Sequence, residues 1–142
     1  VETKEPVVTR DFHGRRILLA EDNELNREIA QTLLEMNGFK VECAVDGQKA
    51  LDRFCAGEPG WFDAILMDIR MPVMNGLTAA RSIRQLKKKK AKTVPIIAMS
   101  ANAFDEDVEK SRAAGMNAHL AKPIEPQLLY ATLQEFIFPE EE

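Results

Sequence analysis

Residues 63–68 read DAILMD, in which four consecutive apolar residues are followed by the carboxylate Asp68. An uninterrupted apolar run of this length is typical of a strand buried on both faces of a parallel sheet. Three further runs end in polar residues in the same way: Glu21-Asp22 follow residues 17–20, Ser100 follows residues 94–99, and Lys122 follows residues 117–121. Because the carboxyl ends of parallel strands meet at one edge of an open sheet, we expect these polar side chains to converge on one pocket.

Strand and helix patterns alternate along the whole chain. The expected strands lie near 15–20, 40–44, 63–68, 94–99 and 117–120, and the expected helices near 24–37, 47–56, 76–88, 104–114 and 126–137. Alternation of this kind predicts right-handed crossovers between parallel strands. We therefore expect an α/β fold, a (βα)5 doubly wound domain around a five-stranded parallel sheet. The second strand alternates polar and apolar residues, which places it at an edge of the sheet.

Local signals support the individual helices. In the first helix, Leu25, Ile29 and Leu33 recur every four residues, and Asp46 is a candidate N-cap of the second helix. In the last helix, Leu129, Leu133 and Phe136 mark the expected inner face.

Composition limits the class of protein. The chain has 142 residues, of which 45% are hydrophobic and 30% charged, as in a single globular domain. Its net charge of −4 argues against general nucleic-acid binding, and the four lysines at 87–90 are interpreted as a solvated loop. No apolar stretch approaches the roughly 20 residues that a membrane span needs. Cys43 and Cys55 are interpreted as reduced core thiols, which fits a cytoplasmic domain without membrane contact.

Domain boundaries follow from the same patterns. Residues 1–14 are polar and lack periodicity, so they are expected to form a linker or tail outside the core. The folded domain is expected over 15–138, followed by an acidic tail over 139–142.

The predicted pocket suits phosphoryl chemistry. Glu21, Asp22 and Asp68 would repel one another unless a cation held them together, and oxygen donors without nearby Cys or His favour Mg²⁺. Asp68 could then act as a nucleophile that forms an aspartyl phosphate. Lys122 would neutralise charge on the phosphoryl oxygens, and the Ser100 hydroxyl would donate a hydrogen bond to one of them. Each of these residues alone would be unremarkable at the end of a strand, but their joint placement favours phosphoryl transfer.

Four motifs resemble the receiver domain of two-component response regulators: LAEDN at 19–23, MDIRMPVMNG at 67–76, AMSA at 98–101 and LAKP at 120–123. The resemblance covers about 15–138 and implies the flavodoxin-like strand order 2-1-3-4-5. It implies that Asp68 is the phosphoacceptor and takes a phosphoryl group from a phosphohistidine, on a histidine kinase or a histidine phosphotransfer domain. Slow autohydrolysis would then return the domain to its resting state, so the domain itself is not expected to be an enzyme.

The resemblance also assigns roles around Asp68. Mg²⁺ would be bound directly by Asp22 and Asp68 and by the backbone carbonyl of Arg70, with Glu21 acting through a water. Arg70 and Asn102 occupy the positions that tune hydrolysis of the acyl phosphate.

Other positions carry the expected switch and partner contacts. Ser100 matches the switch hydroxyl, His119 falls on the aromatic switch position, and Lys122 matches the phosphate-binding lysine whose bond to Pro123 is often cis. The switch is expected to alter the surface of the fourth helix, fifth strand and fifth helix. The histidine-bearing partner is expected to dock at the first helix, near Asn26, Arg27 and Ala30.

Two interpretations of the chain's context and two alternative functions remain open at this point. The run EDNELNRE at 21–28 is similar to receivers at the C-terminal end of hybrid histidine kinases, although a stand-alone receiver, monomeric or weakly dimeric, also fits. A Mg²⁺-dependent phosphohydrolase would usually carry a second acid two residues after its nucleophile, where this chain has Arg70. A degenerate receiver that only binds partners is disfavoured by the joint presence of Asp22, Asp68, Ser100 and Lys122.

Overall fold

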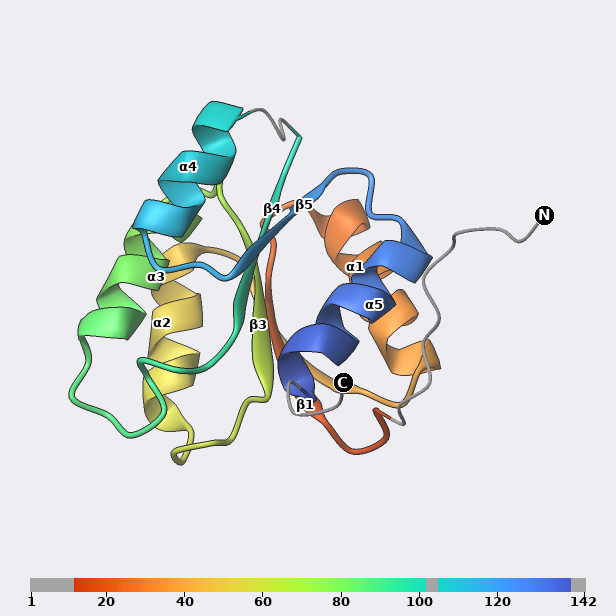
Figure 1. Ribbon diagram of the computed structural model, residues 1–142, viewed down its shortest axis with the longest axis horizontal. Coiled ribbons are helices and arrows are strands. Elements are labelled where there is room, and N and C mark those ends of the chain that lie inside the picture. Colours follow the sequence, from red (N-terminus) through yellow and green to blue (C-terminus); the bar gives the residue numbers. More distant parts are fainter. Residues whose placement is uncertain (1–11, 102–104, 139–142) are drawn as a thin grey trace.

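A five-stranded parallel sheet forms the centre of the molecule in the computed structural model, which describes residues 12–101 and 105–138 (Figure 1). The strands are β1 Arg16–Ala20, β2 Lys40–Ala44, β3 Ala64–Asp68, β4 Ile96–Ser100 and β5 Ala118–Ala121. The helices that alternate with them are α1 Glu24–Met36, α2 Gly47–Ala56, α3 Gly76–Gln85, α4 Asp105–Ala113 and α5 Pro126–Ile137. Asn102, residues 1–11 and the predicted acidic tail lie outside the described residues.

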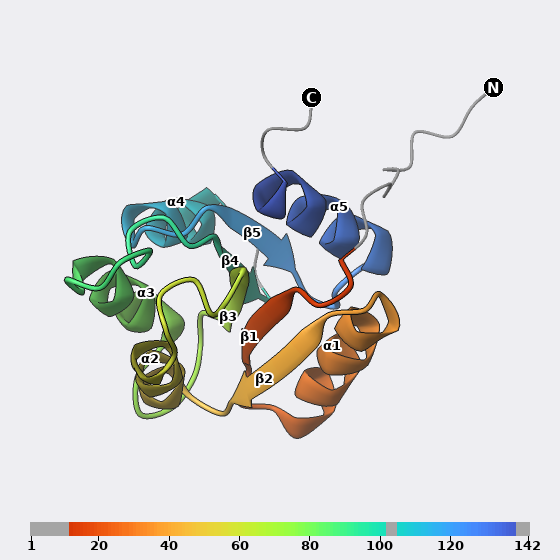
Figure 2. The same ribbon diagram turned by 90° about the horizontal axis from the view of Figure 1, so that it is seen from below.

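The strand order is β2-β1-β3-β4-β5, and every neighbouring pair is parallel. Helices α1 and α5 cover one face of the sheet, and α2, α3 and α4 cover the other (Figures 1 and 2). The expected doubly wound fold, its strand order and the edge position of β2 are therefore confirmed. No helix among the described residues is long and apolar enough to cross a membrane.

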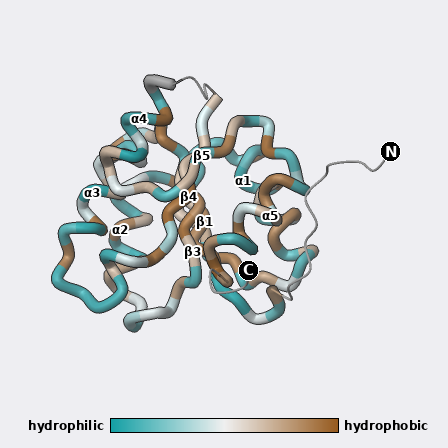
Figure 3. The backbone as a smooth tube through the Cα atoms, viewed as in Figure 1, coloured by the Kyte–Doolittle hydropathy of each residue, from teal (hydrophilic) through white to brown (hydrophobic). Residues whose placement is uncertain are grey.

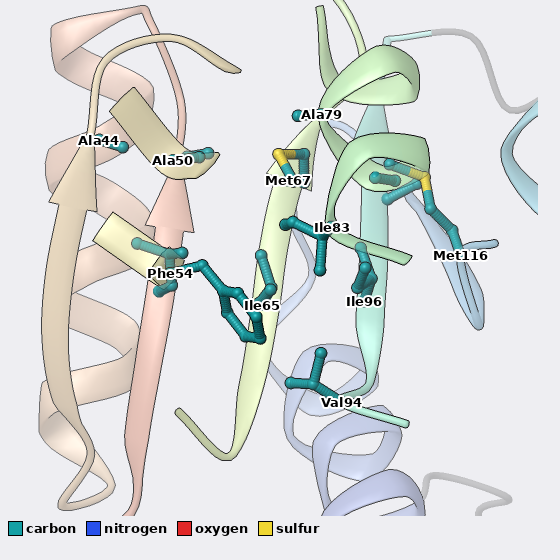
Figure 4. Close-up of a cluster of buried hydrophobic side chains, with 14 of the residues drawn as sticks. Ala44, Ala50, Phe54, Ile65, Met67, Ala79, Ile83, Val94, Ile96 and Met116 are labelled. Carbon is teal, nitrogen blue, oxygen red and sulfur yellow. The ribbon is translucent and has the colours of Figure 1, made fainter. Parts of the chain in front are cut away.

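Alternate residues of each central strand enter two separate cores. On the side of α2 and α3, Ile65, Met67 and Ile96 pack against Phe54 and Ile83 (Figure 4). On the other side, their strand neighbours pack against α1 and α5, a set that includes Ile17, Leu19, Leu66, Ile97, Leu34, Leu129 and Leu133. The strands are consequently apolar throughout, and Figure 3 shows them as a hydrophobic centre between the two helical layers.

Helix α3 is shorter than expected, since it ends at Gln85 instead of residue 88. Leu86 already has an extended backbone, with ψ of 146°. Beyond it, Lys88 donates to the carbonyl oxygens of Cys55 (3.2 Å) and Gly57 (2.5 Å), at the end of α2. The interpretation of residues 87–90 as a purely solvated loop was therefore wrong for Lys88, which binds carbonyls that α2 leaves unpaired.

The buried face of α1 differs from the repeat seen in the sequence. Ala30 and Leu34 are buried, whereas Leu25 is 65% exposed and Ile29 is 48% exposed. The four-residue repeat was thus correct for the helix, but it marks the buried side only at Leu33, which is partly buried against the core. Short Ala30 lets α1 lie close to the sheet, and the bulkier Leu25 and Ile29 project to the surface.

The core begins earlier in the chain than expected. Phe12 is 1% exposed and stacks on Phe39, with ring centroids 4.6 Å apart, and on Phe138 at 6.1 Å. The assignment of all of residues 1–14 to a linker outside the core was therefore wrong at Phe12. A single aromatic residue in a largely polar segment carries no periodicity, so only its long-range contacts identify it as part of the core. Cys55 was also wrongly placed in the core, because its thiol is exposed.

Candidate functional site

The loop after β3 holds Asp68 in place through Asn75 and Gly76. Asn75 caps α3, because its side-chain oxygen accepts a hydrogen bond from the Thr78 backbone N–H at 2.9 Å. Gly76 donates its backbone N–H to the Ile69 carbonyl at 2.8 Å, and a Cβ there would overlap the Asp68 carbonyl oxygen. The Asn-Gly pair of the motif therefore allows the start of α3 to approach the carboxyl end of β3 closely.

Three carboxylates meet at this edge of the sheet. Glu21, Asp22 and Asp68 each offer an oxygen, and these oxygens lie within 4.8 Å of one another. Glu21 is 2% exposed and Asp68 is 4% exposed, whereas Asp22 is open to solvent. The expected convergence of residues from β1 and β3 is thus present in the structure.

Lys122 pairs with both buried carboxylates. Its ammonium nitrogen lies 2.7 Å from Glu21 Oε1 and 2.9 Å from Asp68 Oδ2, and its peptide bond to Pro123 is cis, as the resemblance implied. Burial raises the pKa of Glu21, and this effect outweighs the opposing hydrogen bond from Lys122. Burial alone would lower the pKa of Lys122, but its hydrogen bonds to Glu21 and Asp68 raise it, so the ammonium stays charged.

Backbone groups orient the remaining carboxylate oxygens. Glu21 Oε2 accepts the Asn23 N–H at 3.1 Å, and Asp68 Oδ1 accepts the Arg70 N–H at 3.2 Å. The Arg27 guanidinium donates to the Glu21 carbonyl oxygen at 3.0 Å. These contacts hold Glu21 and Asp68 in fixed directions, so their oxygens face a common point.

The predicted switch residues Ser100 and His119 are in direct contact. Ser100 is 1% exposed, and its hydroxyl oxygen lies 2.8 Å from His119 Nε2. On the other side of the ring, His119 Nδ1 lies 3.3 Å from the Ser111 hydroxyl, which donates to the Val108 carbonyl. With that hydroxyl proton committed, Nδ1 carries the ring proton and Nε2 accepts a hydrogen bond from Ser100 in the neutral tautomer. His119 thereby links the carboxyl end of β4 to α4.

The sequence interpretation missed Asp107. This α4 residue is 9% exposed, and its Oδ2 lies 3.5 Å from a guanidinium nitrogen of Arg70. Both residues line a groove of about 430 Å³ next to Asp22. No local signal separates Asp107 from its acidic neighbours in the sequence, because its burial follows from the packing of α4.

Two of the three predicted docking residues, Asn26 and Ala30, line a small groove beside Lys122, and Arg27 is not among its lining residues. Asn26, Ile29 and Ala30 line this groove of about 70 Å³, together with Lys122 and Pro123. Asn26 is exposed, but Ala30 is only 4% exposed, so it offers little surface to a partner. Apolar contact area at this site is instead provided by Ile29 and by the neighbouring Leu25.

The donor set fits a hard divalent cation. The three clustered carboxylates supply oxygen ligands. Among the described residues, Lys122 forms ion pairs with two of them, and its single positive charge leaves the cluster with net negative charge. Oxygen-only donors of this kind suit Mg²⁺ better than zinc.

The doubly wound sheet carries an acidic cluster, a lysine and a hydroxyl at its carboxyl edge, an arrangement that suits a cation and a phosphoryl group. The family model of the response regulator receiver domain matches residues 17–134, and the chain belongs to this family. It is a receiver domain of a two-component system.

The related proteins include hybrid histidine kinases. The chain is 39% identical over 84% of its length to hybrid signal transduction histidine kinase I of Dictyostelium discoideum, and 34% identical over 84% of its length to the sensory/regulatory protein RpfC of Xanthomonas campestris pv. campestris. These matches span only 7% and 16% of the respective relatives.

Among solved structures, the chain resembles the receiver domain of a sensor histidine kinase from Pseudomonas aeruginosa PAO1. The two are 40% identical, with a TM-score of 0.79 over 88% of this chain and 98% of that one. That neighbour was solved with a magnesium ion coordinated in its active-site cleft.

Proposed function

We propose that this domain accepts a phosphoryl group on Asp68 from a phosphohistidine and thereby switches a partner's activity. The observation that carries the proposal is the placement of Asp68. Its carboxylate is buried at the carboxyl edge of the sheet, bonded to Lys122 at 2.9 Å, and adjacent to Glu21 and Asp22. A buried carboxylate beside two others is unfavourable for stability alone, but it suits a phosphoryl acceptor.

The transfer would proceed by displacement at phosphorus. A carboxylate oxygen of Asp68 forms the new P–O bond while the P–N bond to the histidine breaks, and the imidazole nitrogen leaves with the electron pair. Lys122 donates to the phosphoryl oxygens and offsets part of their charge. Asp22 and Asp68 would hold Mg²⁺ with the Arg70 carbonyl, and Glu21 would support it from outside. When bound, Mg²⁺ supplies further charge neutralisation.

The Ser100 hydroxyl would carry the signal away from Asp68. It has one proton, which His119 Nε2 accepts in the resting state. A phosphoryl group on Asp68 adds about 1.5 to 2 negative charges and competes for that proton. If Ser100 turns toward the phosphate, His119 loses its hydrogen bond to Ser100, and its ring would then reorient inward. The surface of α4, β5 and α5 would change as a result.

Partner contacts are proposed at α1. The exposed Leu25 and Ile29 lie beside Asn26 and Arg27, close to Lys122 and the acidic cluster. A histidine kinase or histidine phosphotransfer domain that packs on this apolar stripe would bring its phosphohistidine near Asp68. The relatives favour a hybrid histidine kinase as the parent protein, whose kinase activity would reside outside this domain.

The test is incubation with acetyl phosphate and Mg²⁺, followed by intact-mass measurement. We expect the wild type to gain about 80 Da, the mass of one phosphoryl group. Asp68→Asn should gain nothing, and Asp63→Asn, at the opposite end of β3, should behave as the wild type. Absence of any gain, together with absence of beryllofluoride binding, would leave the domain a binding module. Steady turnover of p-nitrophenyl phosphate would instead identify a phosphohydrolase.

A further inference from the structure

Asp107 is a buried carboxylate that the proposed chemistry does not use. Its Oδ2 is shielded from solvent and has no hydrogen-bond partner among the described residues. A guanidinium nitrogen of Arg70 lies 3.5 Å from it and forms an ion pair with it. A buried carboxylate oxygen without a hydrogen bond is costly, so its pairing with one exposed arginine requires an explanation.

Arg70 connects this carboxylate directly to the acceptor. Its backbone N–H donates to Asp68 Oδ1 at 3.2 Å, and its side chain crosses the groove to α4. The Arg70 side chain is 67% exposed, so its guanidinium can move without breaking a packed core. Because solvent hydrates the exposed guanidinium, Arg70 loses little when it leaves this ion pair for another anion.

A phosphoryl group on Asp68 would compete with Asp107 for Arg70. The phosphoryl group carries about −1.5 to −2 charges and three acceptor oxygens, which suit bidentate binding by a guanidinium. Asp107 can tolerate the loss because it lies in the first turn of α4, where the helix dipole favours a negative charge.

We infer that Asp107 is a positioning residue that holds Arg70 on α4 in the resting state and competes with phospho-Asp68 for it. The inference rests on the proposed phosphorylation of Asp68. When Arg70 binds the phosphoryl oxygens, it shields the phosphorus from water. Hydrolysis requires water to form a new P–O bond while the bond to Asp68 breaks, releasing inorganic phosphate and the free carboxylate. Asp107 therefore shortens the lifetime of the phosphorylated state by drawing Arg70 away, and phosphorylation loosens α4 from the Arg70 loop.

The experiment measures decay of the phosphorylated protein by intact mass, after acetyl phosphate is removed. Asp107→Asn keeps the side-chain shape but removes the charge, and we expect its phosphate to decay about two- to fivefold more slowly than in the wild type. Arg70→Gln should decay faster than the wild type. In the Arg70→Gln background, Asp107→Asn should have no further effect, because the group that Asp107 attracts is gone.

Two controls separate this role from a general effect on folding or charge. Glu109→Gln removes the same charge from an exposed site on α4 and should leave the decay rate unchanged. Asp107→Glu restores the carboxylate and should return the rate toward that of the wild type. An equal effect of Asp107→Asn in both Arg70 backgrounds, or no effect in either, would overturn the inference. Failure of the wild type to gain a phosphoryl group is a different result, which overturns the proposed function and this inference together.

Discussion

Charged side chains lie at both ends of the parallel sheet, but they differ in burial and in how well their charges are paired. At the carboxyl end, Glu21 and Asp68 are almost fully buried, and both pair with Lys122. Toward the amino end, Glu42 in the middle of β2 remains partly exposed and accepts hydrogen bonds from Trp61 Nε1 at 2.8 Å and from Arg53 at 3.3 Å.

The amino end also contains Arg16 and Asp63 in well-matched contacts. The Arg16 guanidinium lies over the Trp61 ring, 3.8 Å from its centroid, and Asp63 accepts the Arg16 backbone N–H at 2.9 Å. Charges at this end have complementary partners, so they contribute to stability. The carboxyl end holds surplus negative charge, which costs stability and prepares the site for a cation and a phosphoryl group.

The largest expected effect on stability comes from the aromatic residues at the amino end of the sheet. Phe12→Ala removes a ring that stacks on Phe39 and Phe138, and we expect the free energy of unfolding in urea to fall by about 3 kcal/mol. Leu128→Ala, at an exposed position of α5, is the control. If Phe12→Ala lowered the free energy of unfolding no more than the control does, Phe12 would not belong to the core in solution.

Asp68→Asn tests the surplus charge at the carboxyl end. In the absence of divalent cations, we expect this variant to be about 1 kcal/mol more stable than the wild type, because it removes one of three neighbouring carboxylates. Asp63→Asn should be less stable, because Asp63 is paired with Arg15 and with the Arg16 N–H. Added Mg²⁺ should stabilise the wild type and so reduce the difference in stability between it and Asp68→Asn. If both substitutions changed the free energy of unfolding in the same direction, the proposed difference between the two ends of the sheet would be wrong.

Glu42→Gln tests the amino end by a smaller change. The amide can still accept from Trp61, but the ion pair with Arg53 is lost, so we expect a loss of about 0.5 kcal/mol in chemical denaturation. Trp61 fluorescence should shift as its charged neighbour disappears. Glu28→Gln, an exposed α1 site, provides the comparison, and an unchanged Trp61 spectrum would argue against a close Glu42 contact in solution.

The smallest expected effect is a difference in alkylation rate between the two cysteines, which lie near opposite ends of the sheet. Burial raises the pKa of Cys43, near the carboxyl end of β2, whereas Cys55 at the end of α2 is exposed. Iodoacetamide at about pH 8 should therefore modify Cys55 first. Because the folded pKa of Cys43 is raised, its thiol stabilises the fold below the unfolded pKa, and this contribution is lost as the pH rises through the folded value. Peptide mapping after alkylation would reveal the order, and faster modification of Cys43 would contradict it.

Sequence patterns predicted some helix faces better than others. In α5, Leu129 and Leu133 are fully buried as expected, and Phe136 is partly buried. In α1, the repeat of Leu25 and Ile29 lies on the exposed side. Periodicity places residues on one face of a helix but does not show what covers that face. An apolar face that binds a partner has the same sequence pattern as one that packs on the core.

The candidate site also contains residues that the sequence predicted and residues that it did not. Asp22, Asp68, Ser100 and Lys122 could be predicted because each lies at or just after the carboxyl end of a strand, and parallel strands bring such positions together. Asp107 could not, since its relation to Arg70 depends on how α4 packs. Arg84 is a second example: it donates to the carbonyls of Gly115 and Ala91 and to Asn117, joining two loops that no sequence motif connects.

The sequence by itself determined the alternation of strands and helices along the chain, the cap at Asp46, and the polar residues at the carboxyl ends of four strands. These features depend on contacts within a few residues, so they can be read along the chain. Only the tertiary structure decided that Phe12 belongs to the core, that α1 turns Leu25 and Ile29 outward, and that Asp107 faces Arg70. Those outcomes depend on packing between segments distant in the chain, where a side chain is buried or paired according to the space and charge that its neighbours leave.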